Sequence, residues 1–330
     1  MRVGFIGGGS WGATLANLLT DNNHEVLVFD VNQNTVDTIN TTHTHPFFEA
    51  NLNESVIATT KLEEVVNFAD TLVLSVPTKV MRSVLENLNE MLSTPKLFVN
   101  VSKGIEPETS LTISQIAEEV LDSDKIKGFV TLSGPSHAEE VIKRKLTVLV
   151  SASKKLDDAI FVQQLFSNKN YIRIYSSTDI IGVEVAGSVK NAIALISGIC
   201  TGYGLGENAR AALISRGILE IIRITEVLGG KKETAYGLAG IGDLIVTASS
   251  MNSRNFQAGL KIGAGESVDD VVKNSKMIVE GARVLESAHQ IALKHDLYLP
   301  IIDTAYKVLY GNLSVNEAIE IILNAQLKSE

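Results

Sequence analysis

A single lysine in a long apolar segment has the character of an acid–base group. Residues 180–200 contain only two charged side chains, Glu184 and Lys190. A helix this apolar is mostly buried, and burial of an unpaired ammonium is costly and lowers its pKa. A lysine with a pKa near neutrality is a competent general acid and base. Lys190 is therefore the first catalytic candidate. The alternative is a structural pair with a buried carboxylate.

Two segments farther along place polar residues where the local pattern does not require them. Asp243 lies in the apolar, glycine-rich stretch 240–244, and Thr247 follows one helical turn later. Arg254 stands at the start of a predicted helix, where a cation is unfavourable but where its guanidinium and the helix N–H groups can bind a phosphate. Ser253 before it fits a plain N-cap at least as well. Asp243 is therefore a candidate buried carboxylate, and Arg254 is a candidate phosphate-binding residue.

The N-terminal residues have the pattern of a dinucleotide-binding turn. Gly7-Gly8-Gly9-Ser10-Trp11-Gly12 fits G-x-G-x-x-G, and it lies between a predicted strand and a predicted helix. The glycines allow a tight turn and close approach of a pyrophosphate, and the helix N-terminus supplies N–H donors. A glycine-rich turn without this function is the less favoured alternative.

Asp30 bears on the choice of cofactor. It ends the second predicted strand, 18 residues after Gly12. A carboxylate at this position accepts hydrogen bonds from an adenine-ribose diol and repels a 2′-phosphate. The next four residues, 31–34, include no Lys or Arg. We therefore expect a preference for NAD over NADP, unless Asp30 only caps the helix that follows.

Polar residues also follow later strands, at the sheet edge where ligands bind in open α/β folds. Lys103 follows the predicted strand 97–101 and would bring a cation near the cofactor. Ser136 follows the predicted strand 129–132. With Glu139 it also fits a capping box, which is a structural role of equal weight.

The elements that must position these residues change in character near residue 179. Before it, apolar runs typical of buried parallel strands alternate with helical patterns, which indicates an α/β, Rossmann-type doubly wound domain over residues 1–179. After it the patterns are helical, which indicates an all-α domain over residues 180–330. Because this part holds Lys190, Asp243 and Arg254, we expect it to be the substrate-binding and catalytic domain. The predicted strands are 3–6, 25–29, 71–76, 97–101, 129–132, 147–150 and 171–174. The predicted helices are 12–20, 34–40, 79–91, 111–121, 156–166, 179–197, 208–228, 255–262, 268–274, 283–295, 301–309 and 315–323.

Residues 41–60 fit neither period and are expected to be irregular. We expect His43 and His45 on the surface of this segment. The histidines have no ligand-like spacing with one another or with Cys200, so no metal is expected.

The composition excludes several classes of protein. The 330 residues have a formal net charge of −9, which argues against a nucleic acid or an anionic membrane as partner. The single Cys200 excludes an intramolecular disulfide. The chain begins directly with a strand pattern rather than a signal peptide, and the uncharged stretch 191–206 is too short and too glycine-rich to span a membrane. These features predict a cytoplasmic protein that acts on a small molecule without membrane insertion.

Taken together and in this order, the motifs resemble NAD(P)-dependent glycerol-3-phosphate dehydrogenase of the bacterial type. The resemblance runs along nearly the whole chain. Besides the glycine-rich turn, it rests on Val76-Pro77-Thr78, Val101-Ser102-Lys103-Gly104-Ile105-Glu106, Ser133-Gly134-Pro135-Ser136-His137-Ala138-Glu139-Glu140, Ile181-Gly182-Val183-Glu184, Lys190-Asn191, Gly206-Glu207-Asn208, Ala211-Ala212-Leu213-Ile214, Arg216-Gly217, Gly242-Asp243-Leu244, Ser253-Arg254-Asn255 and Val279-Glu280-Gly281.

The resemblance implies reversible reduction of dihydroxyacetone phosphate to sn-glycerol 3-phosphate, which feeds phospholipid synthesis. It implies that Lys190 is the general acid and base, with Lys103 and Asp243 as further catalytic residues. The implied substrate-binding residues are Lys103, Gly134, Ser136, Lys190, Asn191, Asp243, Thr247, Ser253, Arg254 and Asn255. The implied cofactor-binding residues, with Asp30 added from its position, are Gly7, Gly9, Ser10, Trp11, Gly12, Asp30, Lys103, Ala138, Arg254, Ile278 and Glu280.

The chain departs from the family pattern at Asp30-Val31-Asn32, where basic or polar residues are usual, and this supports NAD while NADP stays open. Two other functions remain as alternatives. One is a hydroxyacid dehydrogenase of the 6-phosphogluconate type. The other is an NAD-binding regulator without turnover, which would need neither Lys190 nor Asp243. The oligomeric state is left open, a homodimer included.

Overall fold

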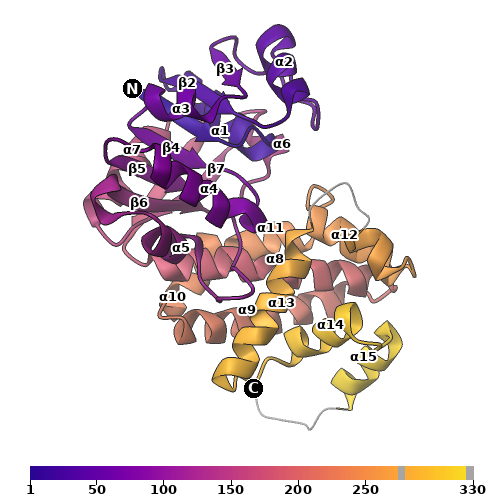
Figure 1. The fold of residues 1–330 in the computed structure, drawn as a ribbon. Helices are drawn as coiled ribbons and strands as arrows, with labels where there is room; N and C mark the ends of the chain where they lie inside the picture. Colours follow the sequence, from indigo (N-terminus) through magenta and orange to yellow (C-terminus); the bar gives the residue numbers. More distant parts are fainter. Residues whose placement is uncertain (274–278, 325–330) are drawn as a thin grey trace. The chain divides into compact units, whose positions relative to one another are not determined.

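The computed structural model describes residues 1–273 and 279–324, and the chain forms two compact units. The first unit comprises Met1–Lys103 and Leu111–Glu184, and the second comprises Gly104–Ser110 and Val185–Glu330. The division falls inside the helix α8, Ile180–Gly202, a few residues after the boundary predicted at residue 179. In Figure 1 the strands lie in the indigo-to-magenta part of the chain, and the orange and yellow part is helical.

The first unit is built on one eight-stranded sheet with the order β3-β2-β1-β4-β5-β6-β7-β8 (Figure 1). The strands are β1 Arg2–Ile6, β2 Glu25–Phe29, β3 Val56–Thr59, β4 Thr71–Leu74, β5 Lys96–Asn100, β6 Ile126–Ser133, β7 Thr147–Ala152 and β8 Ile172–Ser177. All neighbours run parallel except β6 and β7, which are antiparallel. The predicted Rossmann-type doubly wound fold is confirmed.

Helices cover both faces of this sheet because its strands are apolar on both faces. The helices are α1 Ser10–Asp21, α2 Gln33–Thr42, α3 Leu62–Phe68, α4 Thr78–Met91, α5 Ile113–Val120, η1 Ser123–Lys125, α6 Ala138–Val141 and α7 Leu156–Phe166. Val3 and Phe5 of β1 are fully buried in a core that includes residues of α1, α2 and α7. Ile6 is fully buried in a second core, with residues of α3, α4 and α5. Side chains alternate along a strand, so a single strand supports two cores.

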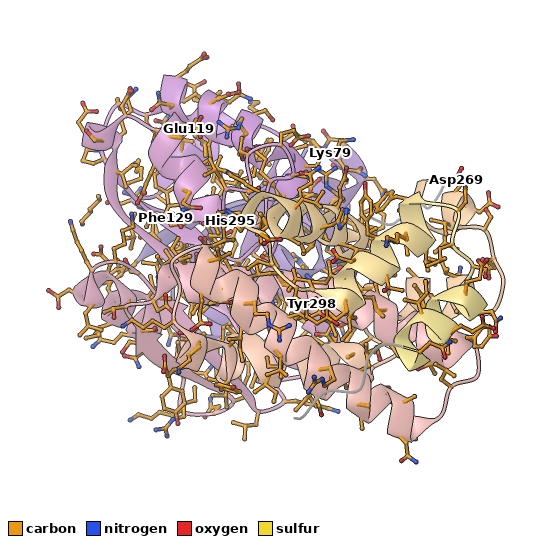
Figure 2. All side chains as sticks on the ribbon, turned by 90° about the horizontal axis from the view of Figure 1, so that it is seen from below. Lys79, Glu119, Phe129, Asp269, His295 and Tyr298 are labelled. Atoms are coloured by element: carbon orange, nitrogen blue, oxygen red, sulfur yellow. The ribbon has the colours of Figure 1, made fainter. Side chains whose placement is uncertain are left out.

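The second unit is helical. Its elements after α8 are α9 Glu207–Val227, α10 Lys232–Ala235, η2 Leu238–Gly242, α11 Asp243–Ala248, α12 Arg254–Gly263, η3 Asp269–Lys273, α13 Glu280–His295, α14 Pro300–Tyr310 and α15 Val315–Leu323. From Asp179 to Asn324 the described residues contain no strand, as predicted. Arg223 of α9 donates to the carbonyl of Tyr298 at 2.8 Å, which ties the turn before α14 to α9 (Tyr298 is labelled in Figure 2).

The helix α8 is long and apolar enough to cross a membrane by length and composition alone. However, 94% of its most apolar window is buried inside the protein. A helix that is apolar on all sides is expected at the centre of a large core. In this chain α8 is such a core helix, and its few charged groups are therefore buried.

Four glycines bring α12 unusually close to α8. A Cβ atom at Gly259 of α12 would lie 2.1 Å from the carbonyl oxygen of Leu195, and one at Gly198 of α8 would lie 2.2 Å from that of Phe256. Gly202 and Gly263 show the same close approach one turn farther along. Only glycine allows two helix backbones to approach in this way. The crossing fixes the start of α12, where Ser253 and Arg254 lie, relative to the helix that carries Lys190.

Some predicted boundaries are wrong. Residues 41–60 are not wholly irregular, because Val56–Thr59 pairs with β2 at the edge of the sheet. This strand is four residues long and was too short for its alternation to show. The helix α3 was missed as well, and the predicted strand 71–76 ends at Leu74. The predicted helix 268–274 is a π-helical segment, Asp269–Lys273, and its last residue lies outside the described part of the chain.

Candidate active site

The glycine-rich turn joins β1 to α1 with no room for side chains. Gly7 has φ = +112°, and a Cβ at Gly12 would lie 2.2 Å from the carbonyl oxygen of Gly7. Ser75, just after β4, donates from Oγ to that same carbonyl at 2.6 Å. Glycine at both positions is therefore required by the turn itself, as the fingerprint predicts.

The outer side of the turn and the start of α1 suit an anion. Gly9 is the N-cap of α1, and a Cβ there would meet no atom within 4 Å. The helix begins at Ser10, two residues before the predicted start, and no acidic residue lies in its first turn. The first N–H groups of a helix have no partner inside it and favour negative charge. These features suit an anionic group at the start of α1, where Ser10 and Trp11 lie.

Asp30 does not cap the helix that follows it. The N-cap of α2 is Asn32, whose side chain accepts from the N–H of Asn34 at 3.0 Å. Asp30 instead accepts from the N–H of Gly8 at 3.0 Å through Oδ2, and from the N–H of Asn32 at 2.8 Å through Oδ1. The carboxylate is thus held against the glycine-rich turn, at the end of β2.

In the first unit, two predicted site residues contact the carbonyl oxygen of Gly134. Lys103 Nζ lies 3.4 Å from it, and Ser136 donates to it from Oγ at 3.0 Å. Gly134 itself has φ = +134°, and a Cβ there would lie 3.1 Å from the Cα of Leu149. The predicted capping box of Ser136 is wrong, because the N-cap of α6 is His137 and the hydroxyl of Ser136 points to Gly134. Ala138 is the first residue of α6 and is buried.

Glu184 is a buried carboxylate to which the sequence assigned no role. Its oxygens accept from the N–H of Ser114, the hydroxyl of Thr131 at 2.8 Å and the side-chain amide of Asn100 at 3.4 Å. Burial raises the pKa of Glu184, while the hydrogen bonds from Ser114 and Thr131 act in the opposite direction. Asn100 also accepts from the N–H of Ser102, next to Lys103, at 3.0 Å. The network therefore fixes the end of β5, from which Lys103 extends.

Lys190, Asp243 and Thr247 form a buried cluster in the second unit. Lys190 is 4% exposed and Asp243 is 2% exposed. Lys190 Nζ donates to Asp243 Oδ1 at 2.9 Å and to Thr247 Oγ1 at 2.6 Å. Thr247 in turn donates from Oγ1 to the backbone carbonyl of Asp243 at 2.6 Å. The hydroxyl hydrogen is thereby committed, so Thr247 presents a lone pair to the ammonium.

The geometry of this cluster is compatible with both interpretations of Lys190, as an acid–base group and as the partner of a buried carboxylate. A carboxylate at 2.9 Å favours the charged ammonium and forms a structural ion pair. The same contact aims Nζ and keeps a proton on it, which suits a general acid. Asp243 follows directly after a π-helical segment, Leu238–Gly242, and such segments are frequent at functional sites.

The start of α12 brings together the remaining polar candidates of the second unit. Ser253 is its N-cap and accepts from the N–H of Phe256 at 3.2 Å, so the capping role is observed. Asn255 is buried, and its Oδ1 accepts from the N–H of Gly281 at 2.9 Å. Arg254 is exposed and forms no ion pair within residues 1–273 and 279–324. A cation at a helix N-terminus without a carboxylate partner in this part of the chain is suited to an anionic ligand.

Asn191 of α8 lies next to Gly281, near the start of α13. It is buried, and a Cβ at Gly281 would lie 2.5 Å from its carbonyl oxygen. Glu280, the first residue of α13, is half-buried. Ile278 lies outside the described residues.

His45 is buried, so its predicted position on the surface is wrong. It is 6% exposed, and its Nε2 lies 2.8 Å from the carbonyl oxygen of Gly8. This segment has no hydrophobic periodicity from which the burial of His45 could be predicted. Within the described residues, no group of three His, Cys, Asp or Glu side chains could hold a metal ion.

Comparison with known proteins identifies a family. Residues 2–159 match the model of the N-terminal part of NAD-dependent glycerol-3-phosphate dehydrogenase, and residues 179–320 match that of its C-terminal part. The chain is 53% identical over 330 residues to "Glycerol-3-phosphate dehydrogenase [NAD(P)+]" of Acholeplasma laidlawii, covering 100% of this chain and 99% of the relative. It is 44% identical over 331 residues to the protein of that name from Listeria innocua, covering 100% and 98%. The crystal structure of glycerol-3-phosphate dehydrogenase from Coxiella burnetii has a TM-score of 0.90 at 28% identity, covering 98% of each chain.

Proposed function

The chain belongs to the NAD-dependent glycerol-3-phosphate dehydrogenase family, and from this we infer its reaction and the residues that carry it out. It is an NAD(P)-dependent oxidoreductase that interconverts dihydroxyacetone phosphate and sn-glycerol 3-phosphate, and its product enters lipid metabolism. The roles of single residues, the preferred cofactor and a cytoplasmic location are our proposals. The observation that carries the chemistry is the buried cluster of Lys190, Asp243 and Thr247.

Lys190 is the general acid in reduction and the general base in oxidation. Reduction of a carbonyl places negative charge on its oxygen, which needs a proton donor in a water-poor site. Lys190 can supply that proton, because its ammonium is held in one place by Asp243 at 2.9 Å and Thr247 at 2.6 Å. Asp243 orients Nζ and offsets the charge that remains buried when substrate leaves.

The cofactor fits the first unit. A bound nicotinamide dinucleotide supplies or accepts the hydride, and its pyrophosphate requires the tight turn that Gly7 and Gly12 allow and the open side of Gly9. Asp30 at the end of β2 favours a ribose diol over a 2′-phosphate, so we assign a preference for NAD. The proposed cofactor residues are Gly7, Gly9, Ser10, Trp11, Gly12, Asp30, Lys103, Ala138, Arg254 and Glu280.

The substrate is a small dianion, and the cations assigned to it are Lys103, Lys190 and Arg254. Arg254 matches a phosphate best, because a guanidinium can donate two parallel hydrogen bonds next to helix N–H groups. The polar residues proposed to complete binding are Gly134, Ser136, Asn191, Asp243, Thr247, Ser253 and Asn255.

Steady-state assays with NADH and NADPH test the reaction and the cofactor. We expect NADH oxidation to depend on dihydroxyacetone phosphate, with kcat/KM higher for NADH than for NADPH. Oxidation with a 2-keto acid instead would favour the hydroxyacid dehydrogenase, and NADH binding without turnover would favour the regulator. A clear preference for NADPH would contradict the role of Asp30.

The variant Lys190→Ala tests the acid–base role. It should lower kcat by roughly 10²–10⁴-fold, while calorimetry should show NADH binding close to that of the wild type. Lys155→Ala, at an exposed lysine before α7, is the matched control and should leave kcat unchanged. Turnover near the wild-type rate in Lys190→Ala would contradict the assignment.

A further inference from the structure

The irregular segment between α2 and β3, residues 43–55, is fastened along α1. The N–H of Asn53 donates to Asn17 Oδ1 of α1 at 2.7 Å, and Leu52 is buried. Phe48 packs against the same core as Trp11, the second residue of α1. The segment is therefore held against α1 at several points and reaches the glycine-rich turn with a defined geometry.

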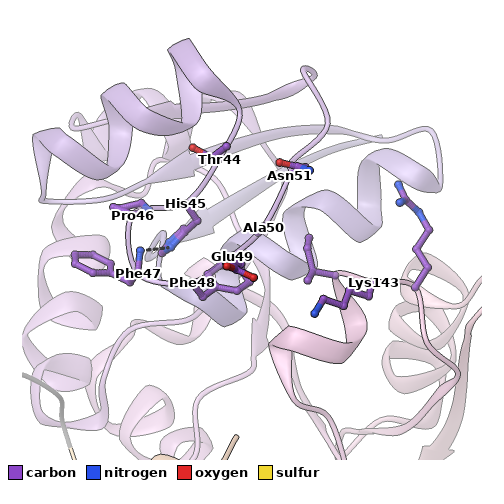
Figure 3. A pocket seen from close by; sticks show the side chains of 11 residues that line it. Thr44, His45, Pro46, Phe47, Phe48, Glu49, Ala50, Asn51 and Lys143 are labelled. Carbon is purple, nitrogen blue, oxygen red and sulfur yellow. Dashed lines mark hydrogen bonds between the residues drawn. The ribbon is translucent and has the colours of Figure 1, made fainter.

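His45 is the side chain that contacts the turn. Its Nε2 lies 2.8 Å from the carbonyl oxygen of Gly8, and the N–H of Phe47 points to its Nδ1 at 3.2 Å (Figure 3). Since Nδ1 accepts from Phe47, the ring hydrogen is on Nε2, and Nε2 donates to Gly8. This is the neutral ring, in agreement with burial, which lowers the pKa of His45. The ring also packs against Phe48, with centroids 4.8 Å apart.

The hydrogen bond from His45 to Gly8 sets the direction of the Gly8–Gly9 peptide group in the glycine-rich turn. In a trans peptide the C=O and the following N–H point in opposite directions, and the described residues contain no cis bond. With the carbonyl of Gly8 held by His45, the N–H of Gly9 must point away from the segment. The N–H of Gly8 is held independently by Asp30 at 3.0 Å. Both backbone groups of Gly8 are thus fixed by side chains.

We propose that His45 is a positioning residue of the cofactor site, which orients the Gly8–Gly9 peptide so that its N–H is directed to the cofactor pyrophosphate. The proposal rests on the proposed function and assigns a role to a segment outside the fingerprint. A glycine-rich turn is intrinsically mobile, because glycine loses more conformational freedom on ordering than any other residue. Fixing the peptide before binding lowers the entropic cost of binding.

The cavity beside His45 determines which variants are informative. His45, Phe47 and Phe48 lie on one side of a cavity of about 870 Å³, and Ile142–Arg144 line it as well (Figure 3). Truncation of His45 would enlarge this space and admit water. The substitution His45→Phe keeps an aromatic ring but removes both the donor to Gly8 and the acceptor for the N–H of Phe47, whereas His45→Gln keeps an N–H donor of similar reach.

Calorimetric titration with NADH, together with initial rates, tests the proposal. In His45→Phe we expect the Kd and KM of NADH to rise by about tenfold, the effect of one hydrogen bond, with kcat and the KM of dihydroxyacetone phosphate little changed. His45→Gln should recover most of the affinity. His24→Ala is the matched control, since His24 lies just beyond the other end of α1, and it should bind NADH like the wild type.

Three results would overturn the role of His45. NADH binding in His45→Phe equal to that of the wild type would remove it while leaving the proposed function intact. Equal losses of affinity and thermal stability in the Phe and Gln variants would show that the ring only packs. Failure of the wild-type protein to bind NADH or NADPH would overturn the proposed function itself, and the role of His45 with it.

Discussion

Glu220 is predicted to make the stability of this protein fall as pH rises through the neutral range. The side chain lies on α9 and is 2% exposed. Its Oε1 accepts from the N–H of Ile301 at 2.8 Å, and its Oε2 accepts from that of Ile302 at 3.0 Å. These donors are in the first turn of α14, which has no side-chain cap of its own. Glu220 therefore caps that helix from a distance in the sequence.

Burial raises the pKa of Glu220 from 4.5 to about 7, although its hydrogen bonds and Arg223 act in the opposite direction. The folded protein thus holds this proton more tightly than the unfolded chain does. The contribution to stability is fully present below pH 4.5 and is lost as pH rises through about 7. The difference of about 2.5 units corresponds to about 3 kcal/mol of unfolding free energy.

The variant Glu220→Gln removes the titration and keeps an acceptor for α14. Urea unfolding is measured at pH 5 and at pH 8. Between these two pH values, the free energy of unfolding of the wild type should fall by up to about 3 kcal/mol more than that of the variant. Any cost of burying the amide is the same at both pH values and cancels. Glu226→Gln, at an exposed position on the same helix, should follow the wild type. Equal losses in wild type and Glu220→Gln would refute the reasoning.

Two further substitutions test the proposed phosphate contact of Arg254, in the second unit, and the proposed ribose contact of Asp30, in the first unit. Arg254→Ala should raise the KM of dihydroxyacetone phosphate by roughly 10–100-fold, the range of a hydrogen bond to a charged group, with a smaller change in kcat. An unchanged KM would remove Arg254 from the phosphate site. Asp30→Asn retains an acceptor for the N–H of Gly8 but removes the charge, so the ratio of kcat/KM for NADPH to that for NADH should rise by about tenfold or more. A ratio that stays constant would show that Asp30 only supports the turn.

The parts of the fold that the sequence predicts are those with a long or repeated signal. The run of apolar strands and the helical second half follow from periodicity, and the turn at Gly7 and Gly12 follows from steric necessity. The edge strand Val56–Thr59 was missed, because four residues at a sheet edge carry too little alternation to separate from a loop. The helix boundary at Ser10 was displaced because a glycine inside the first turn resembles a helix start.

The site is predicted less completely, because side-chain partners depend on tertiary structure. Lys190 and Asp243 stand out as charges in apolar surroundings, yet their mutual distance cannot be read from positions 53 residues apart. His45 carries no local signal, since its burial comes from the attachment of its segment to α1. For Ser136 the local pattern predicted a capping box with Glu139. In the folded chain its hydroxyl donates to the carbonyl of Gly134 instead.

The three buried charges of α8 and α9 differ in a way that bears on function. Glu184 and Glu220 accept hydrogen bonds from backbone N–H groups near helix starts, from Ser114 and from Ile301 and Ile302, where helices lack internal partners. Their burial therefore has a structural reason. Lys190 instead pairs with Asp243, and a buried ion pair can often be replaced by apolar side chains without loss of stability. Stability alone gives little reason for this pair, whereas proton transfer requires an ionisable group held in a water-poor place. This difference supports the proposal that Lys190, rather than Glu184 or Glu220, is the acid–base group.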